Sequence, residues 1–317
     1  MKRRAFFSKT TLGVGAGAAV LAAPAIVHAQ PSIRWRCSSG FPKALDTLYG
    51  AAEDAAKRIG EATDGKFQIT VAPAGEILPM PQAADAVAAG TVEASHTAPF
   101  YYIGKDPTWA FGSCLPFGLN YRQMNAWWMH GGGEKLFNDF LKPQGMRHFI
   151  GGNTGVQMGG WYRKEINTMD DVKGLKMRIP GLGGQLFSAV GAVPQQIPGG
   201  DIYPALERGT IDGAEWVGPY DDEKLGFNKV ARYYYYPGFW EPGASSGWLV
   251  NDEAFEALPE NYQAIFKAAV HESNASMMAK YDALNGAALR RLIAGGTQVK
   301  AFPREVMQGF YDAAVPM

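Results

Sequence analysis

Arg178 is the residue of this sequence whose surroundings best suit the recognition of a ligand. It stands in residues 176–180, KMRIP, an alternation that predicts a short strand ended by the proline. No acidic residue lies within three positions of it. A guanidinium without a local partner can hold a carboxylate through two parallel hydrogen bonds. An ion pair with a distant Asp or Glu would explain the same residue, so the pattern leaves both interpretations open.

A second set of residues has the outline of a serine hydrolase. Residues 130–133 read HGGG, like the oxyanion loop of esterases, and residues 243–247 read GASSG, which fits the nucleophile pattern around Ser245. Asp252 and His271 follow in the order of a catalytic triad. Acid and base would then lie within the next 26 residues, most of them predicted to be helical, which leaves too little chain for the strands between triad members. The hydrolase is therefore the less favoured hypothesis.

The elements that would position these residues predict an α/β protein. Residues 33–37 alternate like a strand, residues 44–63 carry apolar side chains on one helical face, and residues 66–71 alternate again. This order predicts a parallel sheet with helices on its faces.

An aromatic loop leaves the next predicted strand, residues 92–97. Ligands of open α/β sheets bind beyond the carboxyl ends of the strands. Phe100 and Tyr101 are therefore candidate walls of a site, with ordinary core packing as the alternative.

Two short elements follow Arg178. Residues 202–209, IYPALERG, predict a helix with proline in its first turn and glycine as its stop, and residues 210–217 predict a strand. Near the end of the chain, residues 252–292 predict a long helical region with Pro259 at a helix start.

Composition and charge narrow the class of protein. With 47% hydrophobic and 19% charged residues, the 317-residue chain is typical of a globular protein. The first thirty residues contain four basic residues and no acid, so the remainder carries 26 basic and 30 acidic residues, a net charge of −4. This balance argues against nucleic acid as a partner.

The N-terminus predicts export. Arg3 and Arg4 precede a small-residue apolar run over residues 12–27, and residues 27–29, VHA, fit a signal cleavage site. The twin arginine indicates the Tat route. The three glycines and one proline of the run, and its length, argue against a membrane anchor. We expect a signal peptide over residues 1–29 and a periplasmic mature protein that starts near Gln30.

The two cysteines, Cys37 and Cys114, leave two interpretations open: a disulfide in an oxidising compartment, or two buried free thiols. No Cys/His cluster has metal-ligand spacing, so a zinc or iron site is not predicted.

The run from Gly174 to Trp216 closely resembles the extracytoplasmic solute-binding receptors of TRAP transporters. The resemblance is strongest to the branch that binds small 2-oxo or 2-hydroxy monocarboxylates together with a cation. It rests on four ordered segments, which are residues 174–178 (GLKMR), 194–198 (PQQIP), 203–209 (YPALERG) and 211–216 (IDGAEW).

The resemblance implies an α/β, two-domain periplasmic solute-binding fold of the Venus flytrap type, with crossing hinge strands and a long spine helix. The first domain would comprise residues 30–154 plus about 244–283, and the second residues 155–243 plus about 284–317. The chain ends at Met317, earlier than the resemblance leads us to expect, so a homodimer is possible but stays open.

The resemblance also implies the binding residues. Substrate contacts are expected from Arg178, Gln157, Trp216, Tyr101, Phe100 and Asn153. Cation ligands are expected from Glu215, Glu241, Gln157 and the Trp216 carbonyl. Two neighbouring carboxylates repel each other unless a proton or cation lies between them, and oxygen ligands suit a hard cation. Sodium is favoured by the resemblance, and calcium is possible.

The resemblance thus implies a receptor, not an enzyme, that hands a small 2-oxo monocarboxylate such as pyruvate to TRAP permease subunits in the membrane. The bulk of Trp216, Phe100 and Tyr101 favours a short ligand. A same-fold receptor for lactate or another carboxylate is the first alternative, and an exported esterase that uses Ser245 is the second. A dicarboxylate would need a second cationic anchor, and the loops near Arg178 offer none.

Overall fold

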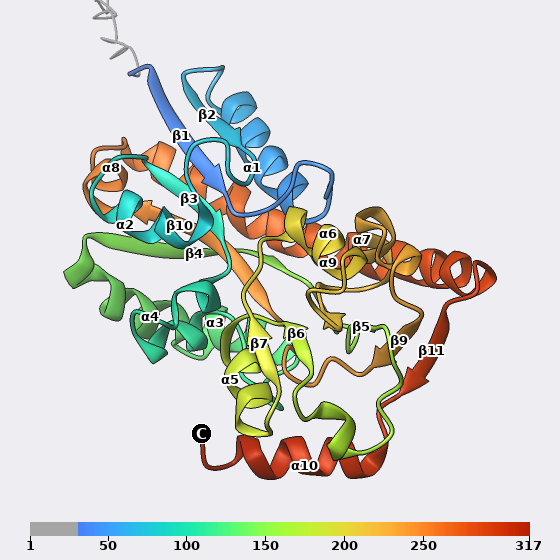
Figure 1. Cartoon of the computed structure of the whole chain (residues 1–317). Helices are drawn as coiled ribbons and strands as arrows, with labels where there is room; N and C mark the ends of the chain where they lie inside the picture. The colour runs from blue at the N-terminus through green and yellow to red at the C-terminus, as the bar shows by residue number, and fades with distance from the viewer. Residues whose placement is uncertain (1–30) are drawn as a thin grey trace, which may run out of the picture. The chain divides into compact units, whose positions relative to one another are not determined.

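Two β-sheets with packed helices make up residues 31–317, the part of the chain that this computed structural model describes (Figure 1). Residues 1–29, where the export signal is predicted, lie outside the described residues. The strands are β1 (Ile33–Ser39), β2 (Phe67–Ala72), β3 (Ala94–Thr97), β4 (Met146–Asn153), β5 (Trp161–Tyr162), β6 (Lys176–Arg178), β7 (Val193–Gln195), β8 (Gly213–Ala214), β9 (Tyr233–Tyr236), β10 (Ser245–Asn251) and β11 (Gln298–Ala301).

Helices alternate with these strands along most of the chain. The α-helices are α1 (Leu48–Ala62), α2 (Ala83–Ala88), α3 (Tyr121–His130), α4 (Gly133–Leu141), α5 (Gly181–Ala189), α6 (Gly199–Glu207), α7 (Pro219–Leu225), α8 (Asp252–Glu256), α9 (Glu260–Ala294) and α10 (Arg304–Ala314). Short 3-10 helices are η1 (Met80–Gln82), η2 (Pro99–Tyr102), η3 (Pro107–Gly112), η4 (Lys142–Gln144), η5 (Met169–Val172) and η6 (Phe227–Lys229).

The first sheet has the strand order β2-β1-β3-β10-β4. Strand β1 pairs in parallel with β2 and β3, as the β-α-β opening predicts, and β10 runs antiparallel to both β3 and β4. The second sheet has the order β11-β9-β5-β8-β6-β7, and in it β5 runs against its two neighbours while the other pairs are parallel.

The antiparallel strands mark where the chain passes between the sheets. It leaves the first sheet from β4, crosses through residues 154–160 and enters the second as β5. It returns from β9 through residues 237–244 and re-enters the first sheet as β10. The predicted crossing strands are thereby confirmed.

The long helix α9, 35 residues in length, contacts both parts of the fold (orange to red in Figure 1). Its first half packs on β4 and α1, its later residues pack on α7, and the chain then enters β11 of the second sheet. Buried residues recur at helical spacing along it, among them Phe266, Val270, Met277 and Tyr281. This is the spine helix that the sequence predicted, with Pro259 at its N-cap.

Local predictions differ from the structure in three places. Helix α1 begins at Leu48 and not at residue 44, and the preceding Asp46 and Thr47 instead contact α7 and α9. Pro204 lies inside α6 and not in its first turn, because the helix already begins at Gly199. The strand predicted over residues 210–217 is reduced to β8, two residues long.

Two further findings concern the core and membrane association. Cys37 and Cys114 are both buried and free, and burial raises the pKa of each thiol. Among residues 31–317, no helix combines the length and the apolar character that a membrane span requires.

Candidate functional site

A cavity lies where the crossing segments meet the two sheets. One apolar cluster around it contains side chains from both sides, such as Phe41 and Ala98 beside the first sheet and Trp216 and Val217 beside the second. The lining residues are Phe41, Leu48, Ala98, Phe100, Tyr101, Thr154, Gln157, Arg178, Pro180, Glu215, Trp216, Val217, Glu241, Ala244, Ser245 and Ser246.

Arg178 and Glu215 meet because their strands are parallel neighbours in the second sheet. Arg178 ends β6 and pairs with Ala214 of β8, so Glu215 is the residue that follows at the same carboxyl edge. The Arg178 guanidinium forms an ion pair with Glu215 through Nη1, which also donates to the Glu215 carbonyl at 2.9 Å. Its Nε donates to the Ile197 carbonyl at 3.0 Å. The distant ion pair that the sequence left open is therefore present, and neither it nor these hydrogen bonds use Nη2.

The two crossing segments bring Gln157 and Glu241 to the same cavity. The Gly238 N–H donates to the Gln157 carbonyl at 2.9 Å, and the Met158 N–H donates to the Val217 carbonyl at 3.0 Å. A Cβ at Gly238 would lie 2.7 Å from the Met158 carbonyl oxygen, so this approach requires glycine. Gln157 thus lies between the segments that carry Glu215 and Glu241.

All four polar side chains are buried, with exposed fractions of 2% for Arg178, 1% for Glu215, 4% for Glu241 and 3% for Gln157. Gln157 Nε2 donates to Glu241 Oε2 at 2.9 Å and to Thr154 Oγ1 at 3.1 Å. Its Oε1 and the Oε2 of Glu215 have no hydrogen-bond partner within residues 31–317. Buried oxygens of this kind are costly unless something binds them.

Burial raises the pKa of both glutamates of the site, and like charge raises that of Glu241 further. Burial raises the pKa of Glu215 to about 7, although the Arg178 charge opposes the change. Burial, together with the charge of Glu215, raises the pKa of Glu241 well above its usual range. With both carboxyls ionised, the two glutamates and Arg178 sum to −1, so a cation is needed before an anion can enter.

The oxygens of the site fit a hard cation. Carboxylate, amide and backbone carbonyl oxygens are the ligands that calcium and similar ions take in proteins. Within residues 31–317, no three or more His, Cys, Asp or Glu side chains gather so that they could hold a metal ion by themselves. A cation here would therefore depend on the Gln157 amide and a backbone carbonyl besides the two glutamates.

Aromatic side chains narrow the cavity. Phe100 and Tyr101, in η2 after β3, contact each other edge to face with ring centroids 4.6 Å apart. The Arg178 guanidinium lies 5.0 Å from the centroid of the Trp216 ring. Burial raises the pKa of Tyr101 to about 12, so its phenol is neutral.

Asn153 is the one predicted site residue that does not line the cavity. Its Nδ2 donates to the Gly243 carbonyl at 3.2 Å, and its Oδ1 accepts the Gly155 N–H at 2.9 Å. Both amide atoms thus stabilise the crossing segments.

Sequence reasoning missed several lining residues, notably Phe41, Leu48, Thr154 and Ser246. Phe41 lies just beyond the carboxyl end of β1, so the rule that singled out Phe100 could have found it. Thr154 orients Gln157 through a contact that only the folded crossing segment creates.

The structure does not assemble the hydrolase. Ser245 lies on β10 and not at a strand-to-helix turn, and its hydroxyl is hydrogen-bonded with the Ser113 carbonyl at 3.0 Å and the Trp128 indole N–H at 3.3 Å. Asp252 pairs with Arg147. No histidine contacts the Ser245 hydroxyl among the hydrogen bonds of residues 31–317.

Comparison with known proteins places these observations in a family. Residues 38–317 match the family described as bacterial extracellular solute-binding protein, family 7. The chain is 54% identical over 278 residues, which is 88% of its length and 76% of the relative's, to a monocarboxylate 2-oxoacid-binding periplasmic protein from Nostoc sp. strain PCC 7120.

Solved structures share the fold. A TRAP transporter solute-binding protein from Bordetella bronchiseptica RB50, described with copurified calcium and picolinate, is 56% identical with a TM-score of 0.89 and covers 90% of this chain and 85% of its own. A TRAP periplasmic solute-binding protein from Pseudoalteromonas atlantica, described with bound sodium and pyruvate, is 38% identical with a TM-score of 0.86. The match covers 89% of this chain and 86% of that protein's chain. The family match over nearly the whole described region and the shared two-sheet fold lead to one conclusion: this chain belongs to family 7 of the bacterial extracellular solute-binding proteins.

Proposed function

We propose that this protein is a periplasmic receptor that binds a small 2-oxo monocarboxylate, of which pyruvate is the model, together with a cation, and delivers it to a TRAP permease. One observation carries the proposal: a buried arginine lines the same cavity as two buried oxygens, Gln157 Oε1 and Glu215 Oε2, that have no hydrogen-bond partner within residues 31–317. The two oxygens can bind a cation, and the guanidinium beside them can donate hydrogen bonds to the carboxylate of an organic acid.

The relatives support this chemistry. The Nostoc protein is described as binding 2-oxo monocarboxylates, the Pseudoalteromonas protein with sodium and pyruvate, and the Bordetella protein with calcium and picolinate. Pyruvate and picolinate both carry a second donor atom next to the carboxylate. A cation can therefore bind either of them through the carboxylate and that neighbouring atom.

In this proposal each polar residue has a distinct role. Glu215, Glu241, Gln157 and the Trp216 carbonyl hold the cation, whose positive charge draws the carboxylate and the adjacent oxygen of the ligand into the cavity. Arg178 donates from Nη2 to the ligand carboxylate. Phe100, Tyr101 and Trp216 enclose the apolar end of the ligand and limit its length.

The same proposal includes the domain division. The first domain would comprise residues 30–154 and about 244–283, the second residues 155–243 and about 284–317, and the two would close over the ligand by hinge motion at the crossing segments. Binding and release would be the whole activity, without catalysis. The buried, fully hydrogen-bonded Ser245 hydroxyl supports this reading over an esterase. Export by the twin-arginine route belongs to the proposal.

The proposal is tested by calorimetric titration of pyruvate into protein that has first been unfolded and then refolded. This cycle removes ligand retained through purification. The titration is run with sodium, with calcium, and after both ions are stripped. We expect binding that weakens sharply without the cation. Pyruvate binding that does not depend on the ion would support the receptor function but contradict the cation site. No binding of pyruvate, lactate or other small carboxylates under any condition would refute the proposal.

A further inference from the structure

Asp222, a buried carboxylate on α7, lies directly behind the cavity and accepts four hydrogen bonds. Its Oδ2 accepts the Trp161 indole N–H at 2.9 Å and the Tyr234 hydroxyl at 2.7 Å. Its Oδ1 accepts the backbone N–H groups of Val217 at 3.3 Å and Gly218 at 3.2 Å. Asp222 itself does not line the cavity, whereas Val217 and Trp216 do.

The Val217 N–H and the Trp216 carbonyl belong to the same peptide group. In a planar trans peptide these two groups point in opposite directions. When Asp222 holds the N–H on its side, the Trp216 carbonyl oxygen must point away from Asp222. Within residues 31–317 this oxygen accepts no hydrogen bond, so it remains available as a ligand.

We propose that Asp222 is a positioning residue of the cation site, which orients and polarises the Trp216–Val217 peptide so that the Trp216 carbonyl can bind the cation. An acceptor with negative charge on the N–H draws electron density toward the carbonyl oxygen and strengthens it as a ligand. This inference rests on the proposed function, because it assigns a role within the cation site of the receptor.

The surroundings of Asp222 make it a rigid support. Trp161 of β5 and Tyr234 of β9 stack with ring centroids 4.0 Å apart and an interplanar angle of 16°. Both side chains come from neighbouring strands of the second sheet, which fixes their polar atoms relative to β8 and the Glu215 segment. Side chains of the sheet therefore fix the position of Asp222, and Asp222 in turn fixes the Trp216–Val217 peptide.

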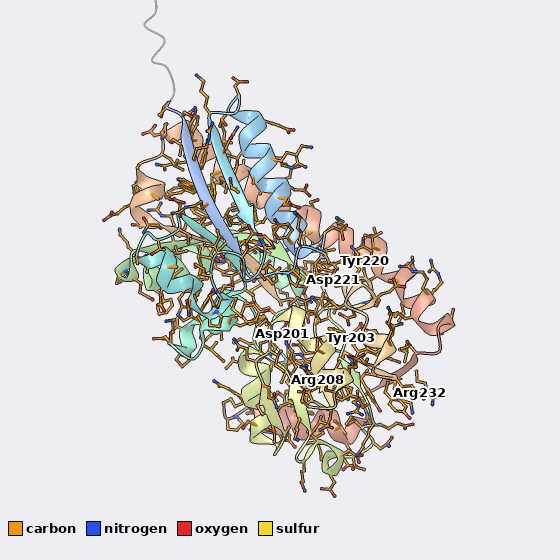
Figure 2. All side chains as sticks on the ribbon, turned by 45° about the horizontal axis from the view of Figure 1, so that its top comes forward. Asp201, Tyr203, Arg208, Tyr220, Asp221 and Arg232 are labelled. Atoms are coloured by element: carbon orange, nitrogen blue, oxygen red, sulfur yellow. The ribbon has the colours of Figure 1, made fainter. Side chains whose placement is uncertain are left out.

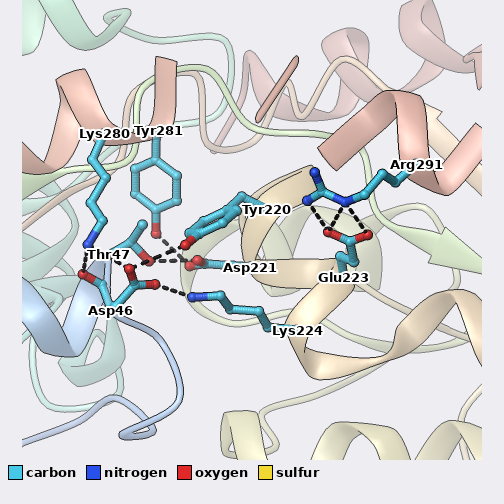
Figure 3. A network of polar contacts seen from close by, with 9 residues as sticks. All are labelled: Asp46, Thr47, Tyr220, Asp221, Glu223, Lys224, Lys280, Tyr281 and Arg291. Atoms are coloured by element: carbon cyan, nitrogen blue, oxygen red, sulfur yellow. Dashed lines mark hydrogen bonds and ion pairs between the residues drawn. The ribbon is translucent and has the colours of Figure 1, made fainter. Parts of the chain in front are cut away.

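The adjacent Asp221 supplies a matched control. It is equally buried on α7, at the point where α7 faces α9 (Figure 2). It accepts the Thr47 hydroxyl at 2.6 Å and the Tyr281 hydroxyl at 2.6 Å (Figure 3). No backbone N–H of the Glu215 segment donates to it. Replacing either aspartate removes a buried carboxylate with two side-chain donors, but only Asp222 holds the site peptide.

The experiment compares Asp222→Asn with Asp221→Asn in the full mature protein. Pyruvate affinity is measured by calorimetry over a series of calcium concentrations, and the midpoint calcium concentration is read from that dependence. We expect the midpoint to rise at least tenfold in Asp222→Asn and to stay within twofold of wild type in Asp221→Asn. Urea unfolding, in which both variants lose stability, separates the positioning role from a merely structural one.

A second matched pair covers the case in which Asp222→Asn does not fold. Tyr234→Phe removes one donor to Asp222, and Tyr281→Phe removes one donor to Asp221, with both rings otherwise retained. We expect a midpoint shift of two- to fivefold for Tyr234→Phe and none for Tyr281→Phe. Equal midpoints within both pairs overturn the positioning role alone. A wild-type protein whose pyruvate binding ignores calcium and sodium overturns the proposed function, and this inference with it.

Discussion

Glu241→Gln should make the ligand-free protein more stable and make it a poorer receptor. Glu241 is buried beside Glu215 in the same cavity, and both burial and the neighbouring charge raise its pKa well above the usual range. The carboxyl therefore keeps its proton to a higher pH in the fold than in the unfolded chain. Glutamine has nearly the same shape and is neutral in both states, and its side-chain oxygen can still accept from Gln157 Nε2.

The size of the gain follows from proton linkage. A carboxyl neutral in the fold but ionised in the unfolded chain costs about 1.4 kcal/mol for each pH unit above an unfolded pKa of about 4.3, or at most roughly 3.8 kcal/mol at pH 7. A new amide N–H without a partner would cost about 1 kcal/mol or more of this. We expect the free energy of unfolding to rise by about 1–3 kcal/mol at pH 7. Because the folded pKa is raised, the penalty disappears as the pH falls toward about 4.5, and the gain with it.

Urea unfolding of the ligand-free protein at pH 7 and at pH 4.5 measures the first half of this prediction, and calorimetry with calcium and pyruvate measures the second. Loss of a cation ligand should weaken binding by about 2 kcal/mol or more, roughly 30-fold. Glu223→Gln is the control, because Glu223 is partly exposed on α7 and pairs with Arg291 (Figure 3), where the effect should stay below about 1 kcal/mol. A variant less stable than wild type at pH 7, or one with unchanged pyruvate affinity, would refute the reasoning.

Three further predictions concern other residues. Arg178→Ala should weaken pyruvate binding by roughly 2–5 kcal/mol in calorimetry, since it leaves the ligand carboxylate without its donor; unchanged affinity would contradict the assignment. Burial lowers the pKa of His96 and of His148 to about 3, so the unfolded chain binds protons that the fold excludes. Their contribution to the unfolding free energy should fall by up to about 1.4 kcal/mol per histidine for each pH unit below about 6.5, and His96→Phe should reduce the slope measured by urea unfolding at pH 7, 6 and 5. Ser245→Ala should leave hydrolysis of a nitrophenyl ester at the level of the wild type; activity abolished by the substitution would favour the esterase instead.

The alternation of strands and helices made the sheet architecture predictable, whereas the site needed more. Strand periodicity placed Arg178 at a strand end, and the resemblance supplied Gln157, Glu215 and Glu241, which the structure brings to one cavity. The role of Asn153 could not be predicted from the sequence, because an amide in a glycine-rich crossing segment can hydrogen-bond either to the ligand or to the backbone. Only the folded structure distinguishes those two uses.

Asp222 escaped sequence reasoning for a related reason. In the sequence it is one of two consecutive aspartates at the end of a turn, and nothing local distinguishes it from Asp221. Their difference arises because neighbouring positions on a helix point about 100° apart. One side chain faces Trp161 and Tyr234, and the other faces Thr47 and Tyr281. Such a distinction depends on tertiary contacts between residues that are far apart in the sequence.

The charges of the cavity explain why a receptor of this kind would require both of its ligands. Arg178, Glu215 and Glu241, when ionised, sum to −1 in a buried site. A monocarboxylate alone would bring the sum to −2, and a calcium ion alone would bring it to +1; both are costly in a medium of low dielectric. Calcium and a monocarboxylate together give 0, and sodium with the same acid gives −1, the same sum as the two ionised glutamates and Arg178 alone. Each partner therefore lowers the electrostatic cost of the other, and closure over the pair is favoured over closure around either one.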